Sequence, residues 1–300
     1  MLWLSVSGSL LSRELFCYTY IMTGREVYVE KIDGSQELFN PEKLAQSLSH
    51  AGASPSAVAA IVAHLESDLV DGVSTADIYR HAFEKLREVH KSLAARYNLR
   101  KAVLALGPTG FPFEKLVAEI LKRKGFSVEL DQIVLGKCVD HEVDVVAWND
   151  EKLIMAEAKF HHESTMKSDI KAALYVKARF DDLTGKDFSY GKKRPLSEGW
   201  LVTNTKFTEK AISYSECAGV YLLGWNYPRV GNLHDLIDET GTYPITSLTA
   251  FSDSEKQRAM AHGVILCRSV VDEHDRLREA GIDEKRISEA VEESKHICPA

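Results

Sequence analysis

The stretch that decides the fold runs from residue 143 to residue 160 and reads VDVVAWNDEKLIMAEAKF. Two apolar runs flank the polar pair Asn149-Asp150, a pattern typical of a β-hairpin. Because alternate side chains of a strand share a face, Glu157 and Lys159 lie on one side of the second strand. A loop of two or four residues also brings Asp144 to that side, diagonally or directly opposite Glu157. An odd-length loop would separate the two carboxylates, so the pattern permits their pairing without requiring it.

These charged side chains stand within apolar strands, where a charge is costly unless it is paired or bound to a metal. Asp144 and Glu157 offer the hard oxygen ligands that Mg²⁺ prefers. Lys159 would then orient a water or offset charge that develops on a phosphate. The alternative is an edge hairpin with a solvated polar face, in which Lys159 pairs with Glu157. Spacing alone does not separate the two interpretations.

A helix is predicted just before the hairpin, because apolar residues recur at helical spacing from Phe113 to Leu121. Pro112 suits the first helical position and Gly125 follows the last turn. Glu114 lies beside the apolar stripe near the helix start. The chain therefore presents three carboxylates in the order helix, first strand, second strand.

This order resembles the PD-(D/E)xK nuclease superfamily and, within it, the Mrr-like restriction endonucleases. The matching residues are Phe113-Glu114, Gly125-Phe126, Val143-Asp144-Val145-Val146 and Glu157-Ala158-Lys159. The resemblance implies that Asp144 and Glu157 bind the metal, that Lys159 assists the nucleophilic water and that Glu114 supports the site. The chain departs from the family in having Val143 where Pro is usual, and His141-Glu142 where glycines are common.

Length and composition bound the function further. Three hundred residues exceed one typical domain, and the net charge of −7 gives the whole chain no basic signature of nucleic-acid binding. A DNA-binding surface would have to be a local patch, and the most basic region lies between residues 167 and 194. Its lysines and arginines suit phosphate contact or a merely solvated face. On a predicted helix over residues 168–183, Ile170, Ala173, Leu174 and Ala178 form the apolar side.

The cysteines and the apolar runs indicate the compartment. Five cysteines are scattered without a C-x-x-C pair, which favours reduced thiols in a cytosol and argues against a zinc site. No run is long enough to span a membrane, so a cytoplasmic location is expected. Residues 1–24 are expected to be a tail or an artefactual extension, with Met22 as the natural start. A homo-oligomer is compatible with the sequence.

Residues 25–108 are predicted to form a small β-hairpin followed by helices. Strands are expected at residues 27–31 and 37–39 around the turn Asp33-Gly34, and a helix begins after the N-cap Asn40. Further helices are expected over residues 55–69, from the cap at Ser74, and over residues 94–106. The third helix should bury Ile78, Phe83, Leu86 and Val89.

This segment resembles an ATP-cone, the regulatory nucleotide-binding module found at the front of ribonucleotide reductases. The matching residues are Val29 to Gly34, Glu37, Phe39, Lys43, Ser74 to Ile78, Ala95-Arg96-Tyr97 and Arg100. The resemblance implies that Lys31 contacts nucleotide phosphate and that Glu37, Thr75 and Tyr79 line the pocket. Ile32 replaces the usual Arg, and the alternative is a helical interaction domain that has lost nucleotide binding. No Walker A loop is present, so ATP or dATP would be an effector.

The end of the chain completes the predicted architecture. Strands over residues 199–203 and 220–225, with a helix between, imply a mixed sheet and resemble the far end of Mrr-like domains. Two helix–glycine–helix pieces after residue 245 loosely resemble helix-hairpin-helix modules, the alternative being a helical cap or dimerisation arm. The expected fold class is multi-domain α/β, with an ATP-cone at 25–108, a nuclease core at 109–244 and a helical tail at 245–300.

The resemblances together imply a Mg²⁺-dependent DNA endonuclease that ATP or dATP regulates through the cone. Two other functions stay open. One is a nucleotide sensor that binds DNA or a protein through a degenerate nuclease fold, and the other is a structural scaffold. The DNA sequence, its modification and the strand preference do not follow from the residues.

Overall fold

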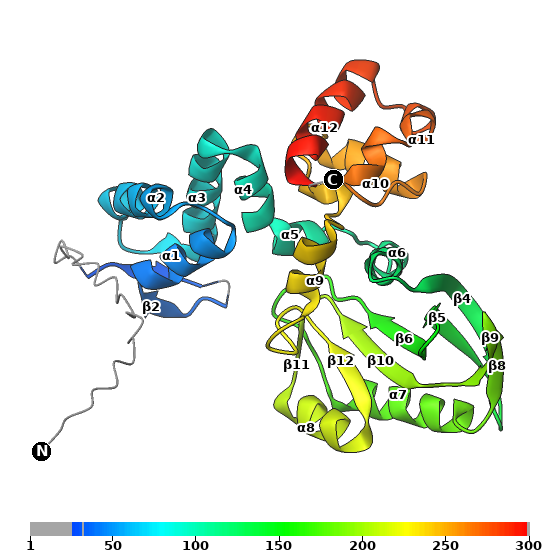
Figure 1. Cartoon of the computed structure of the whole chain (residues 1–300). Helices are drawn as coiled ribbons and strands as arrows, with labels where there is room; N and C mark the ends of the chain where they lie inside the picture. The colour runs from blue at the N-terminus through cyan, green and yellow to red at the C-terminus, as the bar shows by residue number, and fades with distance from the viewer. Residues whose placement is uncertain (1–25, 32, 299–300) are drawn as a thin grey trace, which may run out of the picture.

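The computed structural model describes residues 26–31 and 33–298. The expectations for residues 1–24 and for Ile32 therefore lie outside the described residues. Figure 1 shows three parts: a helical N-terminal unit, a central α/β core and a helical tail that lies above the core beside the end of the N-terminal unit.

The N-terminal unit is helical, with one small sheet. Its elements are β1 (Tyr28–Glu30), β2 (Gln36–Leu38), α1 (Pro41–His50), α2 (Pro55–Asp68), β3 (Val73–Ser74), α3 (Thr75–Val89), α4 (Lys91–Tyr97) and α5 (Leu99–Leu104). The predicted hairpin is confirmed, since β1 and β2 pair antiparallel while β3 joins β1 in parallel. The predicted cap is also present, because Asn40 accepts a hydrogen bond from the backbone N–H of Lys43 at 3.1 Å.

Two details of this unit differ from the sequence prediction. The single helix expected over residues 94–106 is divided into α4 and α5 at Asn98. Val89 is 54% exposed because it ends α3, beyond the apolar contacts that bury Ile78 and Leu86. The unit's own core lies mainly between α1, α2 and α3, around Leu48, Leu65 and Leu86.

The core is built on one five-stranded mixed sheet. Its elements are α6 (Phe111–Arg123), β4 (Ser127–Leu135), β5 (Asp140–Trp148), β6 (Leu153–Lys159), β7 (Lys167–Ser168), α7 (Ile170–Leu183), β8 (Asp187–Tyr190), β9 (Lys192–Pro195), β10 (Glu198–Thr203), β11 (Lys206–Phe207), α8 (Glu209–Ala218), β12 (Val220–Leu223) and α9 (Leu233–Thr240). The strand order is β12-β10-β6-β5-β4. The pairs β4–β5 and β5–β6 are antiparallel, whereas β6–β10 and β10–β12 are parallel. The predicted mixed sheet is confirmed.

Helices cover both faces of this sheet. One face packs against α6, and that cluster continues into α5 and the tail. The other face packs against α7 and α8. Gly199 on β10 permits the close approach of α7, because a Cβ at that position would overlap the ring of Phe180. This packing fixes α7 against β10, the strand that pairs with β6.

The basic region differs from its prediction. Residues 187–195 form the hairpin of β8 and β9, and Arg194 is not on a solvated face but only 8% exposed. Arg194 donates to the backbone oxygens of Asn149 and Lys152, so it supports the β5–β6 turn. On α7 the predicted apolar residue Leu174 is 45% exposed, whereas Arg179 is buried. The prediction from helical spacing was therefore wrong on two counts: it placed Leu174 on the buried side of α7, and it did not place Arg179 there.

The tail consists of short helices around two glycine turns. Its elements are η1 (Ile245–Ser247), α10 (Asp253–Ala261), η2 (Arg268–Val271), α11 (His274–Glu279) and α12 (Glu284–Ile297). Gly263 and Gly281 adopt positive φ after α10 and α11, as C-terminal glycines of helices commonly do. The buried Glu293 of α12 accepts hydrogen bonds from the backbone of Thr249 and Ala250 at 2.9 and 2.7 Å. None of the helices within residues 26–298 is long and apolar enough to cross a membrane.

Candidate active site

The β5–β6 hairpin brings Asp144 and Glu157 together. The loop between the strands comprises residues 149–152, and the pairing runs from Trp148↔Leu153 to Val145↔Ala156. One further step of this register sets Asp144 directly opposite Glu157, as expected for a loop of even length. The backbone N–H of Ala158 donates to Asp144 Oδ2 at 2.7 Å, which fixes the aspartate beside β6.

Glu114 approaches the same place from α6. Its carboxyl group is near enough to Asp144 and Glu157 for their charges to raise its pKa. Burial is the largest cause, and together with these carboxylates it raises the pKa of Glu114 from 4.5 to about 7. Burial and Glu157 likewise raise the pKa of Asp144 to about 6. The site therefore concentrates negative charge that the protein only partly offsets.

Arg179 supplies the positive charge that sequence analysis did not assign to this site. Its guanidinium forms an ion pair with Glu157 Oε2 and a hydrogen bond of 2.8 Å with the hydroxyl of Tyr175. The positive charge of Arg179 also lowers the pKa of Asp144, although less than burial raises it. Arg179 stood out in the sequence only as one of several cations on a helix, and its burial required knowledge of how α7 packs.

Asp131 is a further carboxylate that the sequence motif did not include. Leu130↔Val145 and Gln132↔Val143 flank it in the register of β4 and β5, so Asp131 lies across from Asp144. Its backbone adopts a φ of +54°, unusual for a residue with a side chain. The charge of Asp131 contributes to the raised pKa of Glu114. The acidic group thus extends over three neighbouring strands.

Lys159 ends β6 with an exposed side chain on the same face as Glu157. Thr203 on β10 donates its hydroxyl to the backbone oxygen of Lys159 at 2.8 Å, which holds the strand end in place. The alternative pairing of Lys159 with Glu157 is not what the structure shows, because Glu157 pairs with Arg179. His161 is partly buried and contacts Ser168 through Nε2 at 2.9 Å.

The expected nucleotide site is only partly assembled. Lys31 Nζ lies 2.7 Å from Glu37 Oε2, and Lys43 lies 3.5 Å from the same oxygen. The hydrogen bond with Glu37 raises the pKa of Lys31, which keeps it cationic. Two cations thus meet at the one carboxylate of Glu37 on β2.

Thr75 and Tyr79 lie on the first two turns of α3. The Tyr79 hydroxyl donates to Asn98 Oδ1 at 2.8 Å and to the Tyr97 backbone oxygen at 3.1 Å, and its ring stacks on Tyr97 at 4.8 Å. These contacts connect α3 with the junction of α4 and α5. The described contacts of the Tyr79 hydroxyl do not bring it to Lys31 or Glu37.

The donor set around Asp144 fits a hard divalent cation. Carboxylate oxygens are the ligands that Mg²⁺ prefers. A bound cation would offset both the burial and the neighbouring negative charges that raise the pKa values of Glu114 and Asp144. Asp144 and Glu157 would hold the ion. Glu157 would then give up its ion pair with Arg179 and bind the metal in its place.

The fold is that of a restriction-endonuclease-like protein with an N-terminal ATP-cone domain. The family models agree: an ATP cone domain matches residues 27–102, a restriction endonuclease catalytic domain matches residues 107–225, and an AF1548-like C-terminal domain matches residues 243–298. The predicted order of ATP-cone, Mrr-like core and helical tail is confirmed. The exact boundaries at residues 24/25, 108/109 and 244/245 stay predictions.

The chain belongs to the AF1548-like family. An uncharacterized protein of Archaeoglobus fulgidus is 36% identical over 182 residues, which cover 60% of this chain and 99% of the relative. The crystal structure of AF1548, a protein of unknown function, matches with 34% identity and a TM-score of 0.52 over 63% of this chain and 98% of that one. MspJI restriction endonuclease in complex with a 27-mer oligonucleotide matches with 14% identity and a TM-score of 0.26, covering 68% of this chain and 48% of that one. So low a score supports no argument.

Proposed function

We propose that the protein is a Mg²⁺-dependent DNA endonuclease and that ATP or dATP bound to its N-terminal cone regulates cleavage. The observation that supports this most is the convergence of Glu114, Asp144 and Glu157, with the pKa of Glu114 raised to about 7 and that of Asp144 to about 6. Burying neighbouring carboxylates gives no benefit to a protein that only needs a stable hairpin, whereas a cation site requires the charge.

Each residue then has a distinct role. Asp144 and Glu157 hold the ion, and the Ala158 N–H keeps Asp144 in position. Glu114 orders the ligands from α6. Lys159 positions the attacking water or stabilises the charge that develops on the phosphate. A bound Mg²⁺ supplies a Lewis acid that lowers the pKa of water and offsets phosphate charge.

The proposal of DNA as the substrate has support from exposed cations near the end of β6. Lys167 on β7 and Lys206 on β11 are register partners in a small parallel sheet, and both are exposed. Like charges placed opposite each other are unfavourable unless an anion offsets them. A nucleic-acid backbone would do so without being read for sequence.

Plasmid cleavage tests the nuclease directly. Purified protein is incubated with supercoiled DNA and Mg²⁺, with and without ATP or dATP, beside Asp144→Asn and Lys159→Ala. We expect nicked or linear products from the unaltered chain, loss of cleavage in both variants, and unchanged DNA binding in Asp144→Asn. Cleavage that persists in both variants would reject the site. Equal cleavage and assembly at every nucleotide concentration would reject the regulation.

One observation favours a second function. The ion pair with Arg179 already satisfies Glu157 without a metal, as expected if the fold has become a nucleotide sensor that binds DNA or a protein. Nucleotide binding without cleavage of any DNA, including modified DNA, would favour this function.

A further inference from the structure

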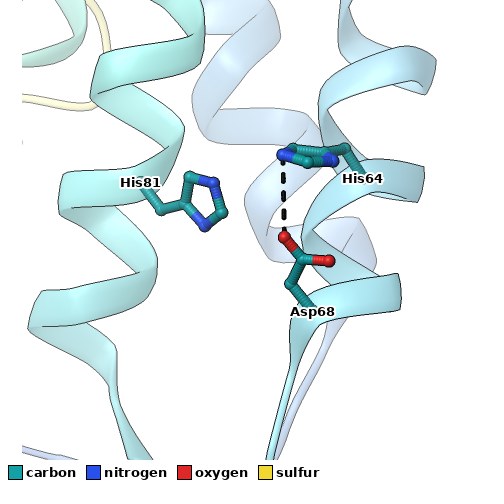
Figure 2. A group of neighbouring side chains, drawn as sticks. All are labelled: His64, Asp68 and His81. Carbon is teal, nitrogen blue, oxygen red and sulfur yellow. Dashed lines mark ion pairs between the residues drawn. The ribbon is translucent and has the colours of Figure 1, made fainter.

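A group of metal-ligating side chains lies in the N-terminal unit, separate from the acidic site. His64 and Asp68 stand one turn apart on α2, so they share a face of that helix. His81 comes from the neighbouring helix α3. Figure 2 shows the imidazole of His81 directed across the gap between the helices, toward the other two side chains. Three residues of metal-binding type therefore meet where α2 and α3 pack.

The distances suit a single ion. His64 Nε2 lies 3.7 Å from Asp68 Oδ2, and one ligand atom from each residue lies within 4.8 Å of the others. Zinc bonds of about 2.0–2.2 Å place two tetrahedral ligands about 3.4 Å apart. Asp68 is exposed and both histidines are partly exposed, so small side-chain rotations can bring the three ligands to that spacing.

The packing of α2 on α3 does not explain the two histidines. Leu65, Ala82 and Leu86 are buried in the apolar core of this unit and hold the helices together. The rings of His64 and His81 meet edge to face with their centres 5.1 Å apart. The two histidines therefore lie beside this apolar core and are not part of it.

We propose that His64, Asp68 and His81 bind one divalent transition-metal ion, such as Zn²⁺, Co²⁺ or Ni²⁺, and thereby join α2 to α3. Two imidazoles and a carboxylate suit these ions, whereas Mg²⁺ prefers oxygen ligands alone. Three protein ligands leave one coordination position for water or another ligand. This site is distinct in place and in metal preference from the acidic group at Asp144.

Cobalt titration of the full-length protein tests the site. The Asp144→Asn, Glu157→Gln double variant serves as the background, so that the acidic site does not contribute. After treatment with EDTA and its removal, we expect one equivalent of Co²⁺ to bind, with visible absorption bands typical of nitrogen and oxygen ligands. His64→Ala or His81→Ala should weaken binding roughly tenfold or more. Excess Mg²⁺ should not compete.

Two further measurements keep a folding defect apart from a lost ligand. His50→Ala removes an exposed histidine from the end of α1 in the same unit and should leave Co²⁺ affinity unchanged. Circular dichroism should show the same helix content in all variants without metal. Equal Co²⁺ affinity in His50→Ala and His81→Ala, or no stoichiometric binding, would overturn the proposal.

Discussion

Arg179 of α7 and Glu157 of β6 form an ion pair at the acidic site, and Arg179 is only 8% exposed. The guanidinium reaches Glu157 because α7 packs closely on the sheet at Gly199. Tyr175, one turn earlier on α7, accepts a second hydrogen bond from Arg179 at 2.8 Å. The arginine thus acts as the internal counter-ion of a carboxylate that is proposed to bind a metal.

Replacement of Arg179 by Met tests whether a metal ion can take the place of Arg179 as the partner of Glu157. The change should lower the free energy of unfolding by roughly 2–4 kcal/mol, somewhat less than for a fully buried pair, because Glu157 stays partly solvated. Mg²⁺ should then raise the melting temperature of Arg179→Met more than that of the unaltered chain, since the ion takes the place of the missing charge. Thermal melts with Mg²⁺ or EDTA measure both effects.

Arg194→Met is the matched control for this experiment. Arg194 is equally buried, but its partners are backbone oxygens of the β5–β6 turn. Its loss should destabilise the fold without increasing the stabilisation by Mg²⁺. The same response to Mg²⁺ in both variants would show that Arg179 has no special relation to the metal site.

Cleavage should depend on pH between about 6 and 8. Mg²⁺ requires deprotonated carboxylates, and the pKa values of Asp144 and Glu114 are raised to about 6 and about 7. The rate at subsaturating Mg²⁺ should therefore fall as the pH drops through 7, by up to roughly tenfold per unit for each group that must ionise. A pH–rate profile that is flat from 6 to 8 would contradict this prediction.

Stability without metal should depend on pH in the opposite direction. Both pKa values are higher in the folded chain than their ordinary values of 4.5 and 3.8. Each group therefore stabilises the fold at low pH, and this contribution is lost as the pH rises through about 6 and 7. Melting temperatures in EDTA should show the loss, and Glu114→Gln should reduce it.

Arg100 offers a test of coupling between the cone and the nuclease core. Its Nη2 donates to the Ser164 backbone oxygen at 2.9 Å, five residues beyond Lys159. Arg100 lies on α5 close to Asn98, which accepts the hydroxyl of Tyr79. Arg100→Met should bring the ratio of cleavage rates with and without ATP closer to one, while nucleotide affinity stays similar. Lys101→Met, an exposed cation on the same helix, should keep the full ratio.

Glu293 should be important for the stability of the tail. Its carboxylate accepts hydrogen bonds from Thr249 and Ala250 and is only 3% exposed. Glu293→Ala leaves these donors without a partner and should lower the free energy of unfolding by roughly 2–4 kcal/mol. Urea denaturation measures this loss. The neighbouring exposed Glu292, which pairs with Lys295, provides a control whose replacement by Ala should not move the midpoint.

The local patterns of the sequence predicted most of the fold because each had one clear physical cause. The Asn149-Asp150 turn predicted the hairpin, and the even loop that it allowed sets Asp144 opposite Glu157. Asn40 and Ser74 predicted the starts of α1 and α3. Such signals depend only on residues close in sequence, so they do not require knowledge of how the rest of the chain packs.

The contacts between distant segments could not be predicted in this way. In the sequence Arg179 looks like any exposed cation on a helix, and only the approach of α7 to β10 buries it. Asp131 lies outside any motif, and the register of β4 places it across from Asp144. The pair of His64 and His81 depends on how α2 meets α3. In all three cases a tertiary contact gives an ordinary residue its place.

The tail has a consequence for how the chain can be divided. Helix α12, the last helix, packs against α4 of the N-terminal unit, and Thr246 donates to the Ala102 backbone oxygen at 2.6 Å. The tail, although last in sequence, therefore contacts the N-terminal unit as well as the core. If a protease cut the chain between α5 and α6, the contacts of the tail would still hold the two fragments together. A recombinant fragment that ends before the tail would expose the apolar sides of α5 and α6. Biochemical work on this protein calls for the whole chain.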